Sequence, residues 1–154
     1  MRTLLLIWLL ATGCAGHRGG FHQRKFLRDV NGQEIRMRVP AGYLRELLYQ
    51  ESSGGFTQFY TYRNGSVFYV SWKVPMPDFN AANIRRAYPD SAAAAKLDIL
   101  QGIDASSLYW KQSHADDLKV GYLNVPKVYR NDFGAALQSV RVRKRPFVQF
   151  LPAN

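Results

Sequence analysis

The sequence predicts an α+β fold: an antiparallel sheet built from hairpins, with two or three helices packed on it. Two observations carry this prediction. Apolar and polar residues alternate on either side of two Asn-Gly dipeptides, a pattern typical of β-hairpins. Later in the chain, capping residues, prolines and apolar residues at helical spacing indicate short helices. With 154 residues, 47% of them apolar, the chain is long enough for one domain with a hydrophobic core.

Two hairpins organise the first half of the chain. Residues 26–39 surround Asn31-Gly32, and residues 57–72 surround Asn64-Gly65. Because Asn and Gly readily adopt positive φ angles, we expect a two-residue loop in each. In the second hairpin, such a loop pairs Tyr60 with Tyr69. The face expected in the core then carries Phe59, Phe68, Val70 and Trp72.

The opposite face of the second hairpin would carry three tyrosines, Tyr60, Tyr62 and Tyr69. Tyrosines on an exposed sheet face can bind ligands by stacking or by hydrogen bonding. They also serve as cross-strand pairs or lie beneath a packed helix, and the structural interpretation is the preferred one. The tyrosine row is therefore a candidate ligand face, and it raises the alternative of a small-ligand carrier.

The remaining elements follow in order. Residues 43–50 fit a strand better than a short helix, because Pro40 and Gly42 precede them and glycines follow. Asp78 can cap a helix that ends before Pro89. A second helix is expected over residues 92–101, with Gly102 as its C-terminal stop.

The last third of the chain alternates between strand and helix patterns. Residues 108–110 and 119–123 read as two strands joined by a turn that contains Asp116 and Asp117. Pro126 fits the first turn of a helix, and its apolar stripe recurs at helical spacing through Val140. The tail, residues 147–151, could dock as an edge strand.

The first residues of the chain predict export. Arg2 is followed by an uninterrupted apolar run, Leu4 to Leu10, then by Ala11-Thr12-Gly13 and Cys14. A charged start, a short apolar region and small residues describe a secretory signal, and the run is too short to span a bilayer. The segment resembles the lipobox of bacterial lipoproteins, although the usual leucine lies one place early. The resemblance implies acylation of Cys14, the only cysteine. The alternative is an ordinary signal cut after Ala15 or Gly16.

We therefore expect a lipoprotein signal at residues 1–13, a lipidated flexible tether at residues 14–21, and a single domain at residues 22–154. The mature protein would be held on the cell envelope by its acyl chains. No acidic residue closely follows Cys14, which favours the periplasmic face of the outer membrane.

The chain carries a formal net charge of +10. For an exported protein this favours phospholipid headgroups, lipopolysaccharide phosphates or an acidic protein as partner, with nucleic acid a distant alternative. If the two ends of the domain lie together, their basic residues form one surface beside the anchor. The alternative is a solvated face that only aids solubility. The candidate partner surface consists of Arg24, Lys25, Arg28, Arg36, Arg38, Arg141, Arg143, Lys144 and Arg145.

Two stretches carry a resemblance beyond the signal. Residues 54–70, and the pattern from Tyr109-Trp110 through Gly121–Pro126 to Val140, resemble small uncharacterised lipoproteins of Gram-negative bacteria. The closing strand and helix also resemble PsbP/Mog1-like α/β sandwiches. Together they cover about half of the chain. The resemblance implies a fold and a location, and it implies no activity.

The sequence holds no pattern typical of an active site. It lacks a Gly-x-Ser-x-Gly elbow, a phosphate-binding loop and a dinucleotide fingerprint. The acidic and histidine residues outside the tether that could ligate a metal, Asp104, His114, Asp116 and Asp117, do not follow a known ligand spacing. We therefore expect the protein to bind neither a cofactor nor a metal. We expect it to act as a non-enzymatic accessory or binding module for another envelope component. A cell-wall hydrolase that uses His114 is a lesser alternative.

Overall fold

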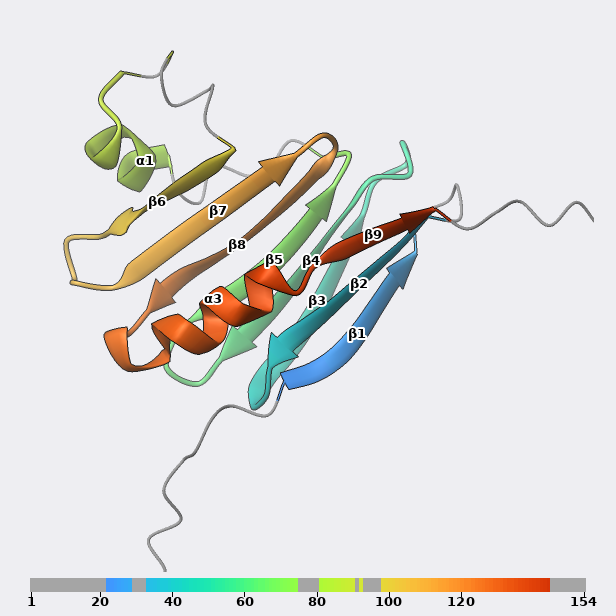
Figure 1. The fold of residues 1–154 in the computed structure, drawn as a ribbon, viewed down its shortest axis with the longest axis horizontal. Coiled ribbons are helices and arrows are strands. Elements are labelled where there is room, and N and C mark those ends of the chain that lie inside the picture. The colour runs from blue at the N-terminus through green and yellow to red at the C-terminus, as the bar shows by residue number, and fades with distance from the viewer. Residues whose placement is uncertain (1–21, 29–32, 75–80, 91, 93–97, 145–154) are drawn as a thin grey trace, which may run out of the picture.

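The computed structural model describes residues 22–28, 33–74, 81–90, 92 and 98–144, and within them the fold is mostly β (Figure 1). A small antiparallel sheet has the order β1-β2-β9, and a large one has the order β3-β4-β5-β8-β7-β6. The small sheet consists of β1 (His22–Arg28), β2 (Gln33–Pro40) and β9 (Arg141–Lys144). The large sheet consists of β3 (Tyr43–Gln50), β4 (Phe56–Tyr62), β5 (Val67–Trp72), β8 (Leu118–Val125), β7 (Tyr109–Ala115) and β6 (Ile99–Ile103).

The predicted α+β class is wrong. The described residues contain one short helix of seven residues, α1 (Ala81–Ala87), a 3-10 turn, η1 (Lys127–Tyr129), and one longer helix, α3 (Arg130–Gln138). Of these, α3 buries Phe133 and Ala136, and none of the described side chains of α1 and η1 is buried. The cover that we expected from two or three helices comes mainly from a second sheet.

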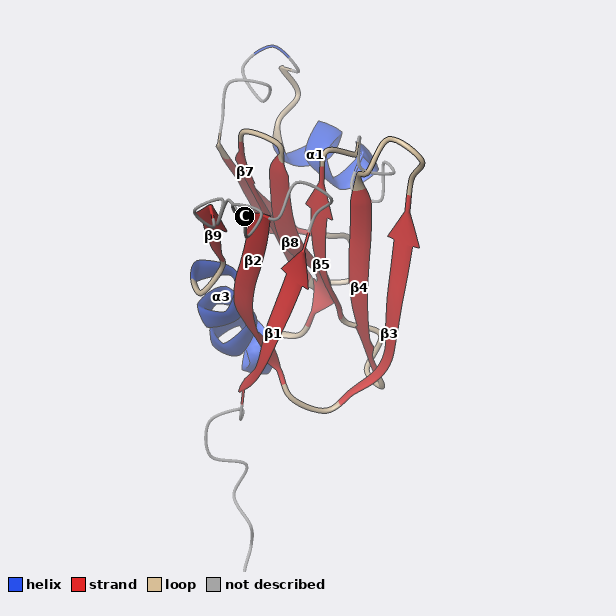
Figure 2. Cartoon of the chain, turned by 90° about the vertical axis from the view of Figure 1, so that its right-hand side faces the viewer, coloured by secondary structure: helices blue, strands red, loops and turns tan. Residues whose placement is uncertain are grey.

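The molecule has two layers (Figures 1 and 2). The small sheet and α3 lie side by side over one face of the large sheet, and the main core fills the space between the layers. The covering layer contributes Ile35, Met37 and Val39 from β2, and Phe133 and Ala136 from α3. The large sheet contributes Phe56, Tyr60, Phe68, Val70, Trp72, Val120, Tyr122 and Val125.

A second, smaller core lies on the opposite face of the large sheet. It consists of Phe59, Tyr69, Trp110 and Leu123. Ile84 and Tyr88, in and just after α1, pack against it. The hydroxyl of Tyr88 also donates a hydrogen bond to the carbonyl oxygen of Gln101 at 3.2 Å, which ties this segment to β6. The large sheet is therefore apolar on both faces.

The second hairpin has a longer loop than we predicted. The N–H of Tyr62 donates to the carbonyl of Ser66 at 2.9 Å, and Gly65 adopts a φ angle of +80°. This closes a three-residue loop, in which glycine relieves the strain of positive φ. The pairing shifts by one residue, so Tyr69 lies opposite Phe59 rather than opposite Tyr60.

The other predicted elements are partly confirmed. Strands β7 and β8 and the helix after Pro126 form as expected, and residues 43–50 form strand β3. The expected helix over residues 92–101 is wrong at its end, because β6 begins at Ile99 and pairs with β7. The predicted cap at Asp78, the turn at Asn31-Gly32 and the tail at residues 147–151 lie outside the described residues.

Two glycines offer a test of this packing. A Cβ at Gly121 would lie 2.5 Å from the carbonyl oxygen of Lys111 and closer still to the hydroxyl of Tyr69, which crosses the strand there. We therefore expect Gly121→Ala to lower the free energy of unfolding by about 1–3 kcal/mol. A Cβ at Gly134, in α3, would meet nothing within 4 Å. Gly134→Ala should raise that free energy by about 0.5–1 kcal/mol. Urea unfolding measures both, and a neutral Gly121→Ala would contradict the close packing of Tyr69.

Candidate functional site

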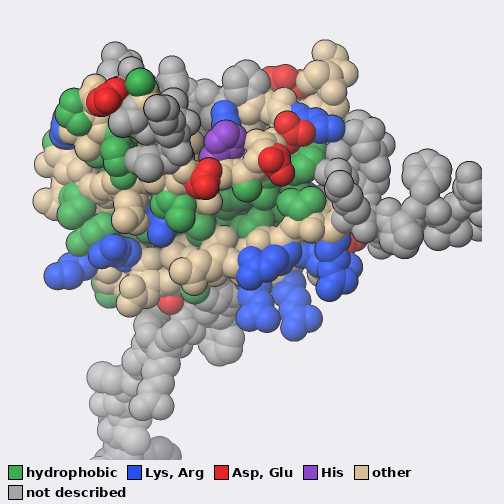
Figure 3. Space-filling model, turned by 45° about the horizontal axis from the view of Figure 1, so that its top comes forward, with side chains coloured by type: hydrophobic (Ala, Val, Ile, Leu, Met, Phe, Trp, Pro, Cys, Tyr) green, Lys and Arg blue, Asp and Glu red, His purple; other side chains and the backbone are tan. Residues whose placement is uncertain are grey.

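The outer face of the small sheet is rich in arginine. The apolar residues of β2 are buried towards the large sheet, and the arginines that alternate with them lie on the outer side. The strand register places Arg24 opposite Arg38, and Arg141 opposite Arg36. Figure 3 shows basic side chains gathered on this side of the molecule. We call this surface the arginine face, and it consists of Arg24, Arg36, Arg38, Arg141 and Arg143.

One carboxylate lies among these arginines. Glu34 of β2 is only 4% exposed and forms an ion pair with Arg36. The register also places it opposite Arg28 on one side and Arg143 on the other. A buried carboxylate needs a cationic partner, and Arg36 supplies one. We did not single out Glu34 from the sequence, where its only signal is that it is the one acidic residue between positions 33 and 40.

Arg141 has a structural role within the arginine face. Its guanidinium donates hydrogen bonds to the carbonyls of Gln138 at 2.6 Å and of Val140 at 2.7 Å, at the C-terminal end of α3. A cation at this end of a helix is favourable, because carbonyl groups are exposed there. Ser139 adds a second tie, since its hydroxyl accepts a hydrogen bond from the backbone N–H of Arg38 at 2.8 Å. Arg141 therefore helps to join α3 to the small sheet.

Three arginines of the face remain available for a ligand. Arg24, Arg38 and Arg143 are all exposed. They come from β1, β2 and β9, one from each strand, so the sheet itself sets their spacing. Because a guanidinium keeps its charge at any physiological pH and donates hydrogen bonds in a planar fork, such a group suits phosphate or carboxylate ligands.

Lys25 does not belong to the arginine face. Its ammonium lies 2.7 Å from a carboxylate oxygen of Glu46 in β3 and 5.0 Å from the centre of the Tyr43 ring, so it bridges the two sheets. Burial lowers the pKa of Lys25, but hydrogen bonds to Glu46 and Tyr43 outweigh that effect and raise it overall.

The other predicted members of the partner surface that the structure describes, Arg28 and Lys144, are placed only by the backbone pairing of their strands. Arg28 pairs with Glu34, and Lys144 pairs with Gln33. Arg145 lies outside the described residues, as does Cys14.

The structure does not bring the three candidate tyrosines onto one open face. Tyr60 and Tyr69 are both fully buried, in the cores on opposite faces of the large sheet. Tyr62 packs against the same core as Tyr60, and its hydroxyl donates to the carbonyl of Pro40 at 2.8 Å. The cause is the three-residue loop, which reverses the relative facing of the two strands. These tyrosines therefore act as core residues.

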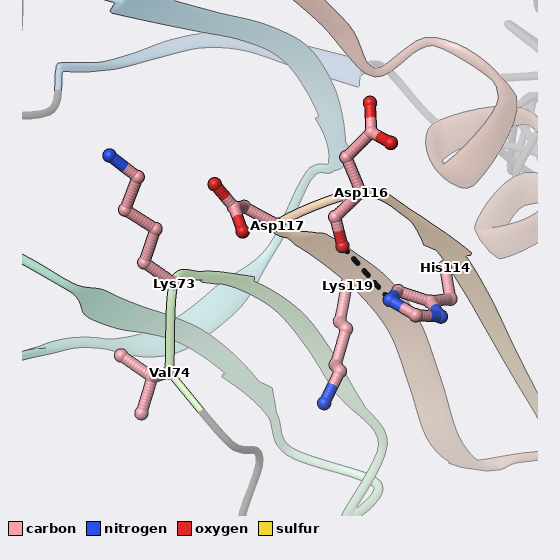
Figure 4. Close-up of a pocket in the computed structure, with 6 residues that line it drawn as sticks. All are labelled: Lys73, Val74, His114, Asp116, Asp117 and Lys119. Atoms are coloured by element: carbon pink, nitrogen blue, oxygen red, sulfur yellow. Dashed lines mark hydrogen bonds between the residues drawn. The ribbon is translucent and has the colours of Figure 1, made fainter.

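The residues that we considered for metal binding or catalysis lie in turns or, for His114, near the end of strand β7. An open hollow of about 260 Å³ is lined by Lys73, Val74, His114, Asp116, Asp117 and Lys119 (Figure 4). Within it, Nε2 of His114 lies 2.9 Å from the carbonyl oxygen of Asp116. Asp104 accepts hydrogen bonds from the backbone N–H groups of Ser106 and Leu108, which is turn chemistry. The described residues contain no group of three or more His, Cys, Asp or Glu that could hold a metal ion.

Comparison of the chain with models of protein families, with curated proteins and with solved structures finds no match. None of the described helices is long and apolar enough to cross a membrane.

We expect the buried tyrosines to make the domain less stable at alkaline pH. Burial raises the pKa of Tyr60 and of Tyr62 well above the usual value of about 10. A tyrosine whose pKa is higher in the folded state stabilises the fold below its unfolded pKa, and this contribution is lost as the pH rises. We therefore expect stability to fall above about pH 10, where unfolded tyrosines ionise. Urea unfolding at increasing pH measures this, with tyrosinate absorbance and circular dichroism as probes.

Replacing these side chains by phenylalanine provides the control. In Tyr60→Phe/Tyr62→Phe the decline in stability with alkaline pH should be less steep, because two of the groups that titrate on unfolding are gone. An equally steep decline in this variant would contradict the assignment.

Proposed function

We propose that this protein is a lipoprotein of the bacterial cell envelope whose domain binds an anionic envelope component through the arginine face, without acting as an enzyme. The observation that carries the proposal is the position of that face. Its exposed arginines lie on the sheet whose first strand, β1, begins at His22. The predicted lipid attachment site, Cys14, is eight residues earlier in the chain.

The tether length favours a ligand at the membrane surface. Eight extended residues span at most about 28 Å, less than the thickness of a bilayer with its headgroups. A domain anchored through Cys14 would therefore keep the small sheet close to the headgroup region. The periplasmic face of the outer membrane is the location that the residues after Cys14 favour.

The chemistry of the face favours phosphate groups. Each basic side chain near an anionic membrane surface contributes about 1 kcal/mol of attraction, and the effect decays within a Debye length. The exposed arginines Arg24, Arg38 and Arg143 lie on one face of one sheet, so they can act together. We therefore favour the anionic headgroups of the anchoring membrane as the ligand, and an acidic envelope protein is the competing outcome.

The anchor can be tested directly. We expect the wild-type chain to incorporate labelled fatty acid and to sediment with membranes, and Cys14→Ser to lose both properties. The measurement is metabolic labelling followed by membrane fractionation and mass spectrometry of the mature N-terminus. A mature chain that starts at Gly16 or His17 without acyl groups would instead establish the ordinary secretory signal and remove the anchor from the proposal.

The arginine face can be tested in the Cys14→Ser chain, where no acyl group masks weak binding. We expect Arg24→Gln/Arg38→Gln/Arg143→Gln to weaken binding to vesicles that contain anionic phospholipid by about tenfold or more, since each arginine contributes about 1 kcal/mol. Vesicle co-sedimentation at low and high salt measures the effect, and zwitterionic vesicles should bind neither chain.

The matched control removes three positive charges elsewhere. Arg63, Arg86 and Lys127 are exposed and lie outside the small sheet, in the β4–β5 turn, in α1 and in η1. Their replacement by glutamine changes the net charge equally and should leave most of the vesicle binding intact. If both triple variants bind vesicles equally, net charge alone explains the attraction and the arginine face is not a site.

A further inference from the structure

Strand β3 presents an unusual edge. In the described part of the chain it forms one end of the large sheet, is eight residues long, and has no neighbour on its outer side. Its exposed apolar side chains, Leu44, Leu47, Leu48 and Tyr49, are 41–60% exposed. Figure 2 views the molecule from the side on which β3 lies. The opposite edge differs, because β6 has only five residues and contacts α1.

Such an edge favours pairing with another strand. Unpaired N–H and C=O groups along a long apolar strand are a template for β-sheet extension, and natural sheets usually shorten, charge or cover their edges. Within β3, only Arg45 and Glu46 are charged, and Glu46 is paired with Lys25. The strand therefore lacks most of the features that prevent pairing.

The hydrogen bonds to β4 determine which groups of β3 face outward. The N–H of Glu51 donates to the carbonyl of Gly55 at 2.9 Å, and the β3–β4 pairing continues from there in antiparallel register. Backbone groups alternate in direction along a strand. The odd-numbered positions from Arg45 to Glu51 therefore bond to β4. The even-numbered positions, Glu46, Leu48 and Gln50, direct their backbone groups to the free edge.

We propose that β3 pairs with β3 of a second copy of this chain, in antiparallel register about a two-fold axis at Leu48. Leu48 then lies opposite Leu48 of the second copy, and Leu47 lies opposite Tyr49. Arg45 lies opposite Glu51, so the same pair of opposite charges forms twice. A two-fold interface requires this kind of self-complementarity, because each contact occurs in both directions.

The other two-fold registers that satisfy the outward backbone groups are poorer. An axis at Glu46 places two like charges opposite each other. An axis at Leu47 places Arg45 opposite Tyr49, an axis at Tyr49 places Glu51 opposite Leu47, and an axis at Gln50 places Glu51 opposite Tyr49. Opposite charges and apolar pairs across strands are favourable, and like charges are unfavourable, so the axis at Leu48 is preferred.

Charge exchange tests the register. Arg45→Glu and Glu51→Arg should each raise the dissociation constant of the dimer by about tenfold, since each creates two like-charge pairs. The double variant Arg45→Glu/Glu51→Arg should recover wild-type association. The mass of the full chain is followed by light scattering over a range of concentrations, and circular dichroism checks the fold of each variant. Arg63→Glu, an exposed site outside β3, is the control for net charge.

Crosslinking tests the axis independently. When Leu48→Cys is introduced into the Cys14→Ser chain, the variant has a single thiol. Directly opposite residues of paired strands are close enough to form a disulfide. Leu44 is as exposed as Leu48, but the proposed register separates its two copies by about 27 Å. We therefore expect mild oxidation to link Leu48→Cys and not Leu44→Cys. A monomer at all concentrations, equal linking of both variants, or a double charge variant that fails to recover association would each overturn the proposal.

Discussion

The architecture depends on the need to cover the inner face of the large sheet. The middle strands β4, β5 and β8 place aromatic and aliphatic side chains on that face, and each large apolar side chain gains about 1.5–3 kcal/mol when it leaves water. The three strands of the small sheet are too few to cover the six strands of the large sheet. The small sheet covers one part and α3 covers the rest, so Phe133 and Ala136 enter the same core as Ile35, Met37 and Val39. The contacts between α3 and β2, and the ties that Arg141 and Ser139 make, hold this composite layer together.

This cover also determines where the positive charge lies. A strand that buries every second residue must expose the others, and in β2 the exposed partners of the apolar residues are arginines. The neighbouring strands repeat the pattern in register, so the arginines form a surface rather than a scattered set. Glu34 is buried within this surface, where it offsets part of the repulsion between the arginines. The arginine face thus follows from the same alternation that builds the core.

The sequence predicted individual strands better than their assembly. Alternation and turn residues were sufficient for the second hairpin, for residues 43–50 and for strands β7 and β8, whereas β9 was not predicted. The length of the loop at Asn64-Gly65 was predicted wrongly, and the error matters because one additional loop residue reverses the relative facing of the two strands. The alanines near residue 92 suggested a helix that runs to Gln101. Residues 99–103 instead pair with β7, where Gly102 leaves room for the ring of Trp110.

The basic residues could be counted from the sequence, but their roles depend on tertiary contacts. Lys25 is adjacent in sequence to Arg24, yet strand alternation directs it between the sheets to Glu46. Arg141 has the same charge as Arg143 but bonds to the end of a helix. Neither contact is visible without knowledge of which strands are neighbours.

Pairing through β3 and binding through the arginine face are geometrically compatible. In an antiparallel ladder, directly opposite residues point to the same face of the sheet. Two copies joined at β3 would therefore carry their small sheets on the same side of one continuous sheet, and both arginine faces would turn in the same general direction. The two lipid tethers, each entering at His22, would also begin on that side. If Cys14 carries the proposed acyl groups, two anchors and two cationic faces directed at one bilayer would bind with avidity, because the second contact would become intramolecular once the first had formed. A surface that binds the membrane with low affinity in one copy would in this way bind it with higher affinity in the dimer.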